Sequence, residues 1–180
     1  MTYNSHDMEM RAAMSAAERV CAAARTAPKA CGIDHLVTLT LTDADKDAVA
    51  AKMEQLSDQY GAGFLMRDAG NVRAAQVLVL FGMKESVRGL GEICGYCHKK
   101  NCAECAESSA VCVYDPMDLG IALGSAAAAA ADCRVDSRIL FSAGRAAAGM
   151  GLMGENVKQI YGLPLAVTGK SPFFDRKPKK

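Results

Sequence analysis

The chain has 180 residues, of which 51% are hydrophobic, and it carries a formal net charge of +1. That length and apolar content are enough to bury one core, so the simplest organisation is a single domain over residues 1–180. The near-neutral charge, with Lys and Arg spread along the chain, gives no reason to expect nucleic acid as a main partner, and the longest apolar run, residues 121–131, is too short to cross a membrane.

The N-terminal segment has the pattern of one long amphipathic helix. Apolar residues recur at spacings of three and four over residues 5–27, Ser5 is a suitable N-cap, and Pro28 ends the helix. The loop that follows carries two cations, Arg25 and Lys29, close to a Gly. Such a loop could hold an anion such as a cofactor phosphate, or it could be a turn with two solvated charges.

The next segment alternates strands and helices. Residues 35–42 alternate as a strand, and Thr42 begins a helix that ends before Gly61. Residues 64–71 show no clear period. Residues 75–81 form a continuous apolar run that predicts a buried strand.

The C-terminal half is rich in small residues. A helix is expected from Met117 to about Cys133, and its many Ala and Gly residues allow neighbouring backbones to approach closely. A second helix is expected to begin at Asp136 and to continue to Met150. Residues 160–167 predict a strand, with Pro164 marking an edge position or an interruption. The whole pattern predicts an α+β fold with a cysteine-rich insertion at residues 88–115.

Five of the eight cysteines lie close together, at Cys94, Cys97, Cys102, Cys105 and Cys112. Five neighbouring thiols can form disulfides, bind a metal ion or hold an inorganic cluster. The first ten residues lack the basic segment and apolar run of a signal peptide, so we expect a cytoplasmic protein. Thiols are normally reduced in that compartment, which makes disulfides the weakest explanation.

The spacing of the cysteines favours an iron–sulfur cluster over a zinc ion. A cluster is larger than one ion and needs thiolates from several directions, which suits short, irregular spacings followed by a more distant cysteine. Paired zinc-binding Cys-x2-Cys units are usually separated by roughly 15–20 residues, whereas only four residues separate Cys97 from Cys102. Zinc held by Cys94, Cys97, Cys102 and Cys105 stays open. A plant-type ferredoxin spacing, with Cys133 as a distant fourth ligand, is a further alternative.

Several longer motifs accompany the cysteines. They are C-G-Y-C-x4-C at 94–102, D-L-G-I-A-L-G-S at 118–125, V-D-S-R-I-L-F-S at 135–142 and G-L-P-L-A-V-T-G-K-S-P-F-F-D-R at 162–176. On these motifs the chain resembles a family of uncharacterised prokaryotic proteins described as containing a ferredoxin domain. The resemblance implies a [4Fe–4S] cluster with Cys94, Cys97, Cys102 and Cys112 as ligands and Cys105 as an additional thiol. It implies electron transfer, but neither a specific reaction nor a redox partner.

A weaker similarity links the chain to the FMN-dependent nitroreductases. It rests on the A-A-R-T-A-P turn at 23–28, the Ala/Gly-rich helix and the G-L-P sequence at 162–164. This similarity implies a mixed sheet packed with helices, and a homodimer formed through the central helix with a flavin at its interface. The segment that grips the FMN phosphate in that family is missing here. Arg25, Lys29, Lys170 and Arg176 are therefore the candidates for an FMN phosphate.

The sequence thus predicts an iron–sulfur redox protein. The alternatives are a structural module in which zinc or a cluster only fastens a loop, and an FMN-dependent oxidoreductase of the nitroreductase type. The cluster is expected at the N-terminal end of the helix near Met117, where the helix dipole favours negative charge. Lys99 and Lys100 would then lie near the cluster and could raise its reduction potential or attract an acidic redox partner.

Overall fold

Four antiparallel strands form one sheet in the order β1-β2-β4-β3. The strands are β1 (Leu36–Thr42), β2 (Val77–Lys84), β3 (Asp136–Ser137) and β4 (Val157–Ala166). The structure is a computed structural model, and it describes residues 1–174. The two inner strands, β2 and β4, pair over most of their length.

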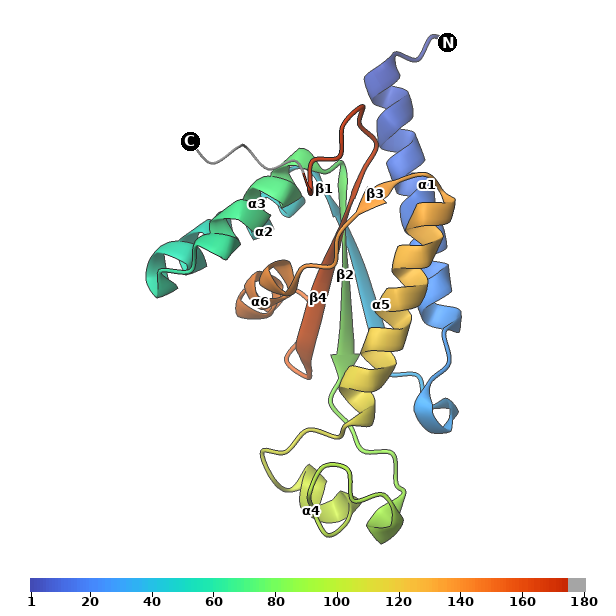
Figure 1. Cartoon of the computed structure of the whole chain (residues 1–180), viewed down its shortest axis with the longest axis vertical. Helices are drawn as coiled ribbons and strands as arrows, with labels where there is room; N and C mark the ends of the chain where they lie inside the picture. The colour runs from blue at the N-terminus through green and yellow to red at the C-terminus, as the bar shows by residue number, and fades with distance from the viewer. Residues whose placement is uncertain (175–180) are drawn as a thin grey trace.

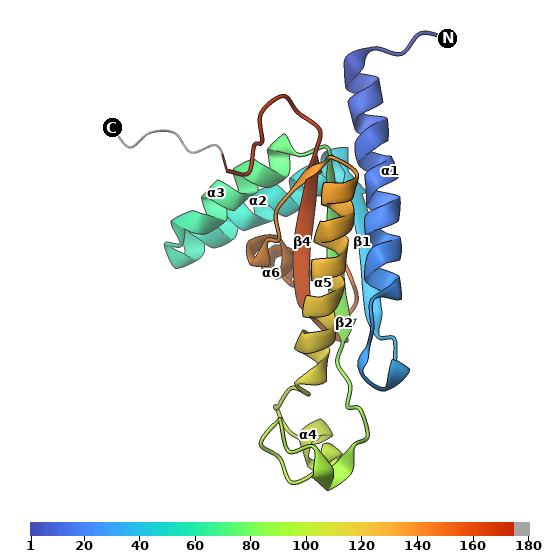
Figure 2. The same cartoon turned by 45° about the vertical axis from the view of Figure 1, so that its right-hand side comes forward.

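Helices cover both faces of this sheet, as Figures 1 and 2 show. One face carries α1 (Ser5–Thr26) and α5 (Tyr114–Asp132), and the other carries α2 (Asp43–Tyr60), α3 (Gly63–Ala74) and α6 (Phe141–Gly149). The side chains of β2 alternate between the two layers: Val77, Val79, Phe81 and Met83 pack with α1 and α5, whereas Leu78 and Leu80 pack with α2 and α6. The predicted α+β class is therefore confirmed, with two separate core layers. None of the helices within residues 1–174 is long and apolar enough to span a membrane.

The cysteine-rich segment is the connection between β2 and α5. It includes the short helices η2 (Gly91–Ile93) and α4 (Cys102–Ala106). Figure 1 shows this connection beyond the end of the sheet, next to the N-terminal end of α5. The insertion was thus correctly predicted to lie between a buried strand and the central helix.

Two local predictions were wrong, and one helix was not predicted. The N-cap of α1 is Asn4, not Ser5: the Asn4 side chain accepts a hydrogen bond from the backbone N–H of Asp7 at 2.9 Å. Residues 63–74 form α3, in which the buried Leu65, Ala69 and Val72 lie on one face. The helix expected from Asp136 begins only at Phe141, because residues 136–140 pair with β4 instead.

Pro164 interrupts the pairing between β3 and β4. Gly162 exchanges both backbone hydrogen bonds with Leu140, at 2.8 and 2.9 Å. Alternate residues of a strand turn their backbone groups to the same side, so Pro164 faces the same neighbour without an N–H to donate. The continuous part of β3 accordingly ends at Ser137, and an isolated bridge at Leu140 follows. The predicted interruption is present, but β4 is an inner strand.

Two glycines let α6 lie directly on β4. A Cβ atom added at Gly144 would lie 1.7 Å from the carbonyl oxygen of Ile160, and one added at Gly162 would lie 2.7 Å from the Cβ of Ala143. The small residues therefore have a packing role at this contact. On the opposite layer, α5 has an outer face without such contacts, because nothing lies within 4 Å of a Cβ added at Gly120 or Gly124.

This difference predicts opposite effects for the same substitution at two helical glycines. Gly144→Ala should lower the free energy of unfolding by about 2 kcal/mol or more, because the methyl group meets backbone atoms of β4 that cannot yield locally. Gly124→Ala should leave it unchanged or raise it by up to about 1 kcal/mol, since Ala is the better helix former and the site is open. Urea unfolding followed by circular dichroism measures both; equal effects would contradict the packing described here.

Candidate metal centre

Five cysteines converge on one small pocket, which we call the thiol pocket. It is lined by Cys94, Cys97, Cys102, Cys105 and Cys112 together with Arg88, Lys99, Val113 and Tyr114, among others. The thiols come from the end of η2, the turn after it, the two turns of α4 and the loop before α5. None of the five is in a disulfide. The structure therefore brings all four predicted ligands, and the additional thiol, to one place.

Tight backbone turns bring these thiols together. Gly91 and Gly95 have φ values of 62° and 63°, and His98 has a φ of 59°, so the chain passes through the left-handed region three times between residues 91 and 98. Glycine adopts this region without strain, which explains its use on either side of Cys94. Asn101 then caps α4 by accepting a hydrogen bond from the backbone N–H of Glu104 at 3.0 Å.

Cys105 is the most deeply buried of the five thiols, with 2% of its surface exposed. Burial, followed by its hydrogen bond to Cys97 and the nearby charges of Cys97, Cys112 and Cys102, raises the pKa of Cys105 to about 11. Its Sγ lies 3.9 Å from the carbonyl oxygen of Ala110. Cys105 is thus held as a neutral thiol among three other sulfur atoms.

Cys94 lies on the side of the pocket that adjoins Tyr114. Burial, followed by the charges of Cys94, Tyr96 and Cys31, raises the pKa of the Tyr114 hydroxyl. The rings of Tyr96 and Tyr114 are 6.3 Å apart. Cys31, an exposed residue of the turn η1 (Ala30–Gly32), therefore approaches the same side of the pocket from outside the cysteine-rich segment.

The thiols share a pocket without forming a compact site for one ion. Within residues 1–174, no three His, Cys, Asp or Glu side chains are arranged so that they could hold a single metal ion. Cys133 is excluded from the pocket by distance: it follows the last residue of the 19-residue helix α5, about 28 Å from the N-terminal end at a rise of ~1.5 Å per residue. The plant-type alternative that needed Cys133 is therefore wrong.

A buried ion-pair network lies directly behind the thiol pocket. Nη1 of Arg88 is 2.9 Å from Oδ1 of Asp115, and its Nη2 donates to Oδ2 of Asp118 at 2.9 Å. These three side chains are only 1–2% exposed. Burial by itself lowers the pKa of Arg88, but its hydrogen bond to Asp118 and the charges of Asp115 and Asp118 raise the pKa overall. Arg88 is therefore held as a cation inside the protein.

The same network fixes three backbone segments. Asp115 accepts a hydrogen bond from the backbone N–H of Ser86 at 2.9 Å, and Asp118 accepts one from the N–H of Ala30 at 3.0 Å. Nη1 of Arg88 also donates to the Ser86 hydroxyl at 2.6 Å. The first turns of α5 thus hold both the start of the cysteine-rich segment and the loop after α1.

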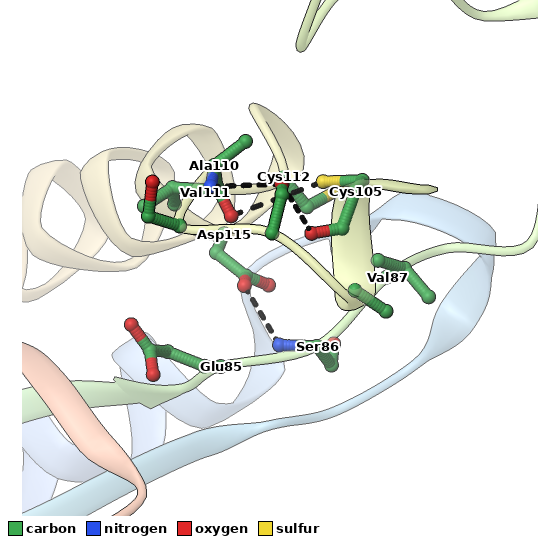
Figure 3. A pocket seen from close by; sticks show the side chains of 11 residues that line it. Glu85, Ser86, Val87, Cys105, Ala110, Val111, Cys112 and Asp115 are labelled. Atoms are coloured by element: carbon green, nitrogen blue, oxygen red, sulfur yellow. Dashed lines mark hydrogen bonds between the residues drawn. The ribbon is translucent and has the colours of Figure 1, made fainter. Parts of the chain in front are cut away.

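A second, larger cavity adjoins the thiol pocket, and we call it the polar pocket. It has a volume of about 540 Å³ and is lined by residues of 85–87, 105–112 and Asp115. Figure 3 shows Glu85 and Ser86 on one side, Cys105 and Cys112 on the other, and Asp115 between them. Cys105 and Cys112 line both cavities, so the two pockets share a wall.

Comparisons with known proteins identify the family of this cysteine-rich chain. Residues 108–176 match the family model described as "Uncharacterized protein containing a ferredoxin domain (DUF2148)". A curated protein of Archaeoglobus fulgidus, itself described as uncharacterized, is 35% identical over 188 residues, with 100% of both chains covered. The chain belongs to this ferredoxin-domain family. The matched segment contains Cys112 and α5, while the other four cysteines of the pocket precede it.

Solved structures of nitroreductases have a similar fold. Nitroreductase CinD from Lactococcus lactis, in complex with nicotinic acid, has a TM-score of 0.61 at 17% identity and covers 93% of this chain and 84% of its own. NfrA1 from B. megaterium has a TM-score of 0.58 at 14% identity and covers 92% of this chain, which spans 62% of the length of NfrA1. At these identities the likeness shows the fold alone, and it confirms the predicted nitroreductase-like architecture.

The candidate residues for an FMN phosphate lie in different places. Arg25 pairs with Asp34 at 2.7 Å, and the ammonium group of Lys29 donates to the carbonyl oxygens of Ala24, Arg25 and Ala27 at the end of α1. Lys29 therefore caps the C-terminal end of this helix, whereas Arg25 links the helix to Asp34 and the start of β1. Lys170 lies in the loop after β4, far from Arg25 and Lys29 in the sequence. Arg176 lies outside the described residues. Their role towards FMN stays a prediction.

The two lysines next to the cysteines differ in their surroundings. Lys99 lines the thiol pocket, whereas Lys100 is exposed and its ammonium group lies 3.9 Å from Glu92. Lys99 is thus the better placed of the two to act on a group in the pocket. The sequence interpretation did not identify Arg88 or Tyr114, although both line the same pocket.

The ion-pair network predicts a large stability difference between two similar substitutions. Asp118→Asn should lower the free energy of unfolding by about 3 kcal/mol, because it leaves part of the buried Arg88 charge unpaired. Asp34→Asn breaks the exposed pair with Arg25, whose side chains are 46% and 38% exposed, and should cost at most about 1 kcal/mol. Thermal and urea unfolding of both variants measure this; a milder effect at Asp118 than at Asp34 would contradict the assignment.

Proposed function

We propose that the protein binds a [4Fe–4S] cluster in the thiol pocket and passes single electrons through it. The observation that carries this proposal is the convergence of five free thiols from separate turns on one small pocket. Membership of a ferredoxin-domain family supports the same cofactor class. When bound, such a cluster supplies the gain and loss of one electron at a time.

The donor set fits an iron–sulfur cluster. Cys94, Cys97, Cys102 and Cys112 would hold it, since four thiolates are the usual ligands and these four come from separate turns around the pocket. Cys105 would be the spare thiol beside the cluster, since it is deeply buried and hydrogen-bonded to Cys97. Five thiols that reach one pocket from separate turns suit an object larger than one zinc ion.

The surrounding residues suit a negatively charged redox group. The pocket includes Val113 and Tyr114, so it lies at the N-terminal end of α5, where the helix dipole favours negative charge. Lys99 adds a positive charge at the pocket wall. Arg88, whose side chain is 1% exposed, closes the pocket on the side of the domain core.

Chemical analysis of anaerobically purified protein tests the cofactor directly. We expect roughly four irons and four sulfides per chain and a brown colour with broad absorption near 400 nm. Colourless aerobic material should recover both after anaerobic reconstitution with iron and sulfide. Stoichiometric zinc without sulfide would instead support a structural metal module and refute the redox proposal.

Single substitutions identify the ligands. Cys94→Ser, Cys97→Ser, Cys102→Ser and Cys112→Ser should each remove at least half of the bound iron, because each takes away one thiolate. Cys105→Ser should retain the cluster, since Cys105 is the spare thiol of the proposed set. Iron and sulfide content per chain measures this. Retention in Cys112→Ser together with loss in Cys105→Ser would reassign the fourth ligand.

A flavin is the second candidate cofactor, favoured by the nitroreductase-like fold. The proposed alternative is an FMN-dependent oxidoreductase in which the cluster has a secondary role. Heat-released yellow chromophore with the mass of FMN, near one per chain, would support it. Lys170→Ala or Arg176→Ala should then lose the chromophore, whereas Arg25→Ala and Lys29→Ala should retain it. That result would assign the FMN phosphate to Lys170 or Arg176.

A homodimer through α5 is part of the proposal. The outer face of this helix is apolar and open: Met117 and Ile121 are 44% and 42% exposed, and Gly120 and Gly124 follow the same stripe. A second copy of the same helix fits this face, because small residues let two backbones approach and the face carries no charge that would be desolvated.

Light scattering coupled to size-exclusion chromatography tests the dimer. We expect twice the chain mass of 19.0 kDa for the natural sequence. Gly124→Arg should give the monomer mass, because it places a charge in the middle of the contact, while Lys52→Ala on the opposite layer should leave the dimer intact. A monomer for the natural sequence would refute this part of the proposal.

A further inference from the structure

Arg88 has a buried guanidinium group with one donor left over. Its Nη1 and Nη2 atoms are taken by Ser86, Asp115 and Asp118. Its Nε is buried and has no hydrogen-bond partner among the described residues. An unsatisfied buried donor costs about 1–3 kcal/mol, so the free Nε calls for an acceptor.

The thiol pocket, which Arg88 lines, supplies five sulfur atoms as candidate acceptors. Arg88 lines the thiol pocket together with all five cysteines, and it stands six positions before Cys94 in the same segment. Its side chain is 1% exposed, so bulk water does not compete for the free N–H. Hydrogen bonds to the sulfur atoms are among the factors that set the potential of an iron–sulfur cluster.

The geometry points to Arg88 as a positioning residue that donates a hydrogen bond from Nε to a sulfur atom of the cluster site and thereby raises the reduction potential. This inference rests on the proposed function. The electron enters the cluster from an external one-electron donor, and no bond forms or breaks at Arg88. The N–H stabilises the reduced form more than the oxidised form, because the reduced sulfur atoms carry more negative charge.

The charge of Arg88 does not by itself favour reduction of a cluster in the pocket, because two carboxylates accompany it. One guanidinium and two carboxylates give the network a formal charge of +1 − 2 = −1. The field of that net charge opposes the addition of an electron. A directed N–H is therefore the part of the network that favours reduction, and it acts only over hydrogen-bonding distance.

Arg88→Lys separates the directed donor from the charge. Lys keeps the positive charge, and its three N–H donors match the three acceptors that the network offers, Ser86, Asp115 and Asp118. No donor is then left for the sulfur atoms. The matched control is Arg67→Lys on α3, where Arg67 pairs with the buried carboxylate of Asp68 at 2.7 Å on the other layer of the domain.

The test is a redox titration of the intact, cluster-loaded protein, followed by electron paramagnetic resonance. Arg88→Lys should shift the reduction equilibrium at least tenfold towards the oxidised form, which is a potential lower by 59 mV for a one-electron couple. Arg67→Lys should titrate like the natural sequence. An unchanged or higher potential in Arg88→Lys would overturn the inference.

A measurement on the natural sequence covers the case in which Arg88→Lys loses its cluster. Protein labelled with ¹⁵N-arginine and reduced anaerobically should show a ¹⁵N coupling to the paramagnetic cluster in pulsed resonance spectra, and Arg67→Lys should show the same coupling. Absence of this coupling would also overturn the inference. Iron and sulfide analysis of the natural protein comes first, so that a missing cluster refutes the proposed function, whereas a cluster without the arginine effect refutes only the role of Arg88.

Discussion

The ion-pair network of Arg88, Asp115 and Asp118 fixes the position of the cysteine-rich segment. It joins residue 88 to the first turns of α5, and through Ser86 and Ala30 it also holds the end of β2 and the loop after α1. Because Cys112 stands only two residues before α5, the same network positions both ends of the segment. A segment of nearly thirty residues with little regular structure is thereby held at one point.

A connection made by buried charges carries a large desolvation free energy. Taking each ion out of water costs several kcal/mol, and apolar side chains of equal volume are often as stable. What the charges add is directionality, since a guanidinium accepts only a few arrangements of carboxylates around it. In this protein that directionality fixes which turn of α5 faces the cysteines. It also pairs the carboxylates of Asp115 and Asp118 with the charge of Arg88. Paired carboxylates oppose the positive field of the helix N-terminus at the thiol pocket less than unpaired ones would.

The regular elements were predictable where burial follows a simple period. The strand β2 is covered on both faces, so its continuous apolar run identified it, and α2 was recognised from the regular spacing of Val49 and Met53, both fully buried. The helix α3 was missed because it leaves Phe64 and Met66 44% exposed and buries Asp68 and Asn71, which obscures the helical spacing of its buried apolar residues. The pairing of residues 136–140 with β4 depends on a tertiary contact at Gly162, which no local pattern encodes.

The candidate site divides in the same way. The cysteines were identified from their spacing alone, because a metal or cluster ligand needs a particular residue type close in sequence. Arg88 was not identified, since its role depends on a tertiary contact with two carboxylates of α5. A single Arg in the sequence does not reveal that contact. A usable signal was present in the spacing of Asp115 and Asp118: residues three apart at a helix start lie on one face, and two carboxylates buried together require a cation.

The separation of the sheet from the cysteine-rich segment bears on how an electron would reach the site. The sheet and its helices form the body of the domain, and the cysteine-rich segment lies beyond the end of β2 (Figure 2). Cys105 and Cys112 line both the thiol pocket and the polar pocket, so the sulfur atoms are separated from solvent on that side by a cavity and not by packed core. Arg88, on the side of the domain core, is closed to water. For the proposed cluster, the polar pocket would thus be the side open to an electron donor, while Arg88 would act from the buried side.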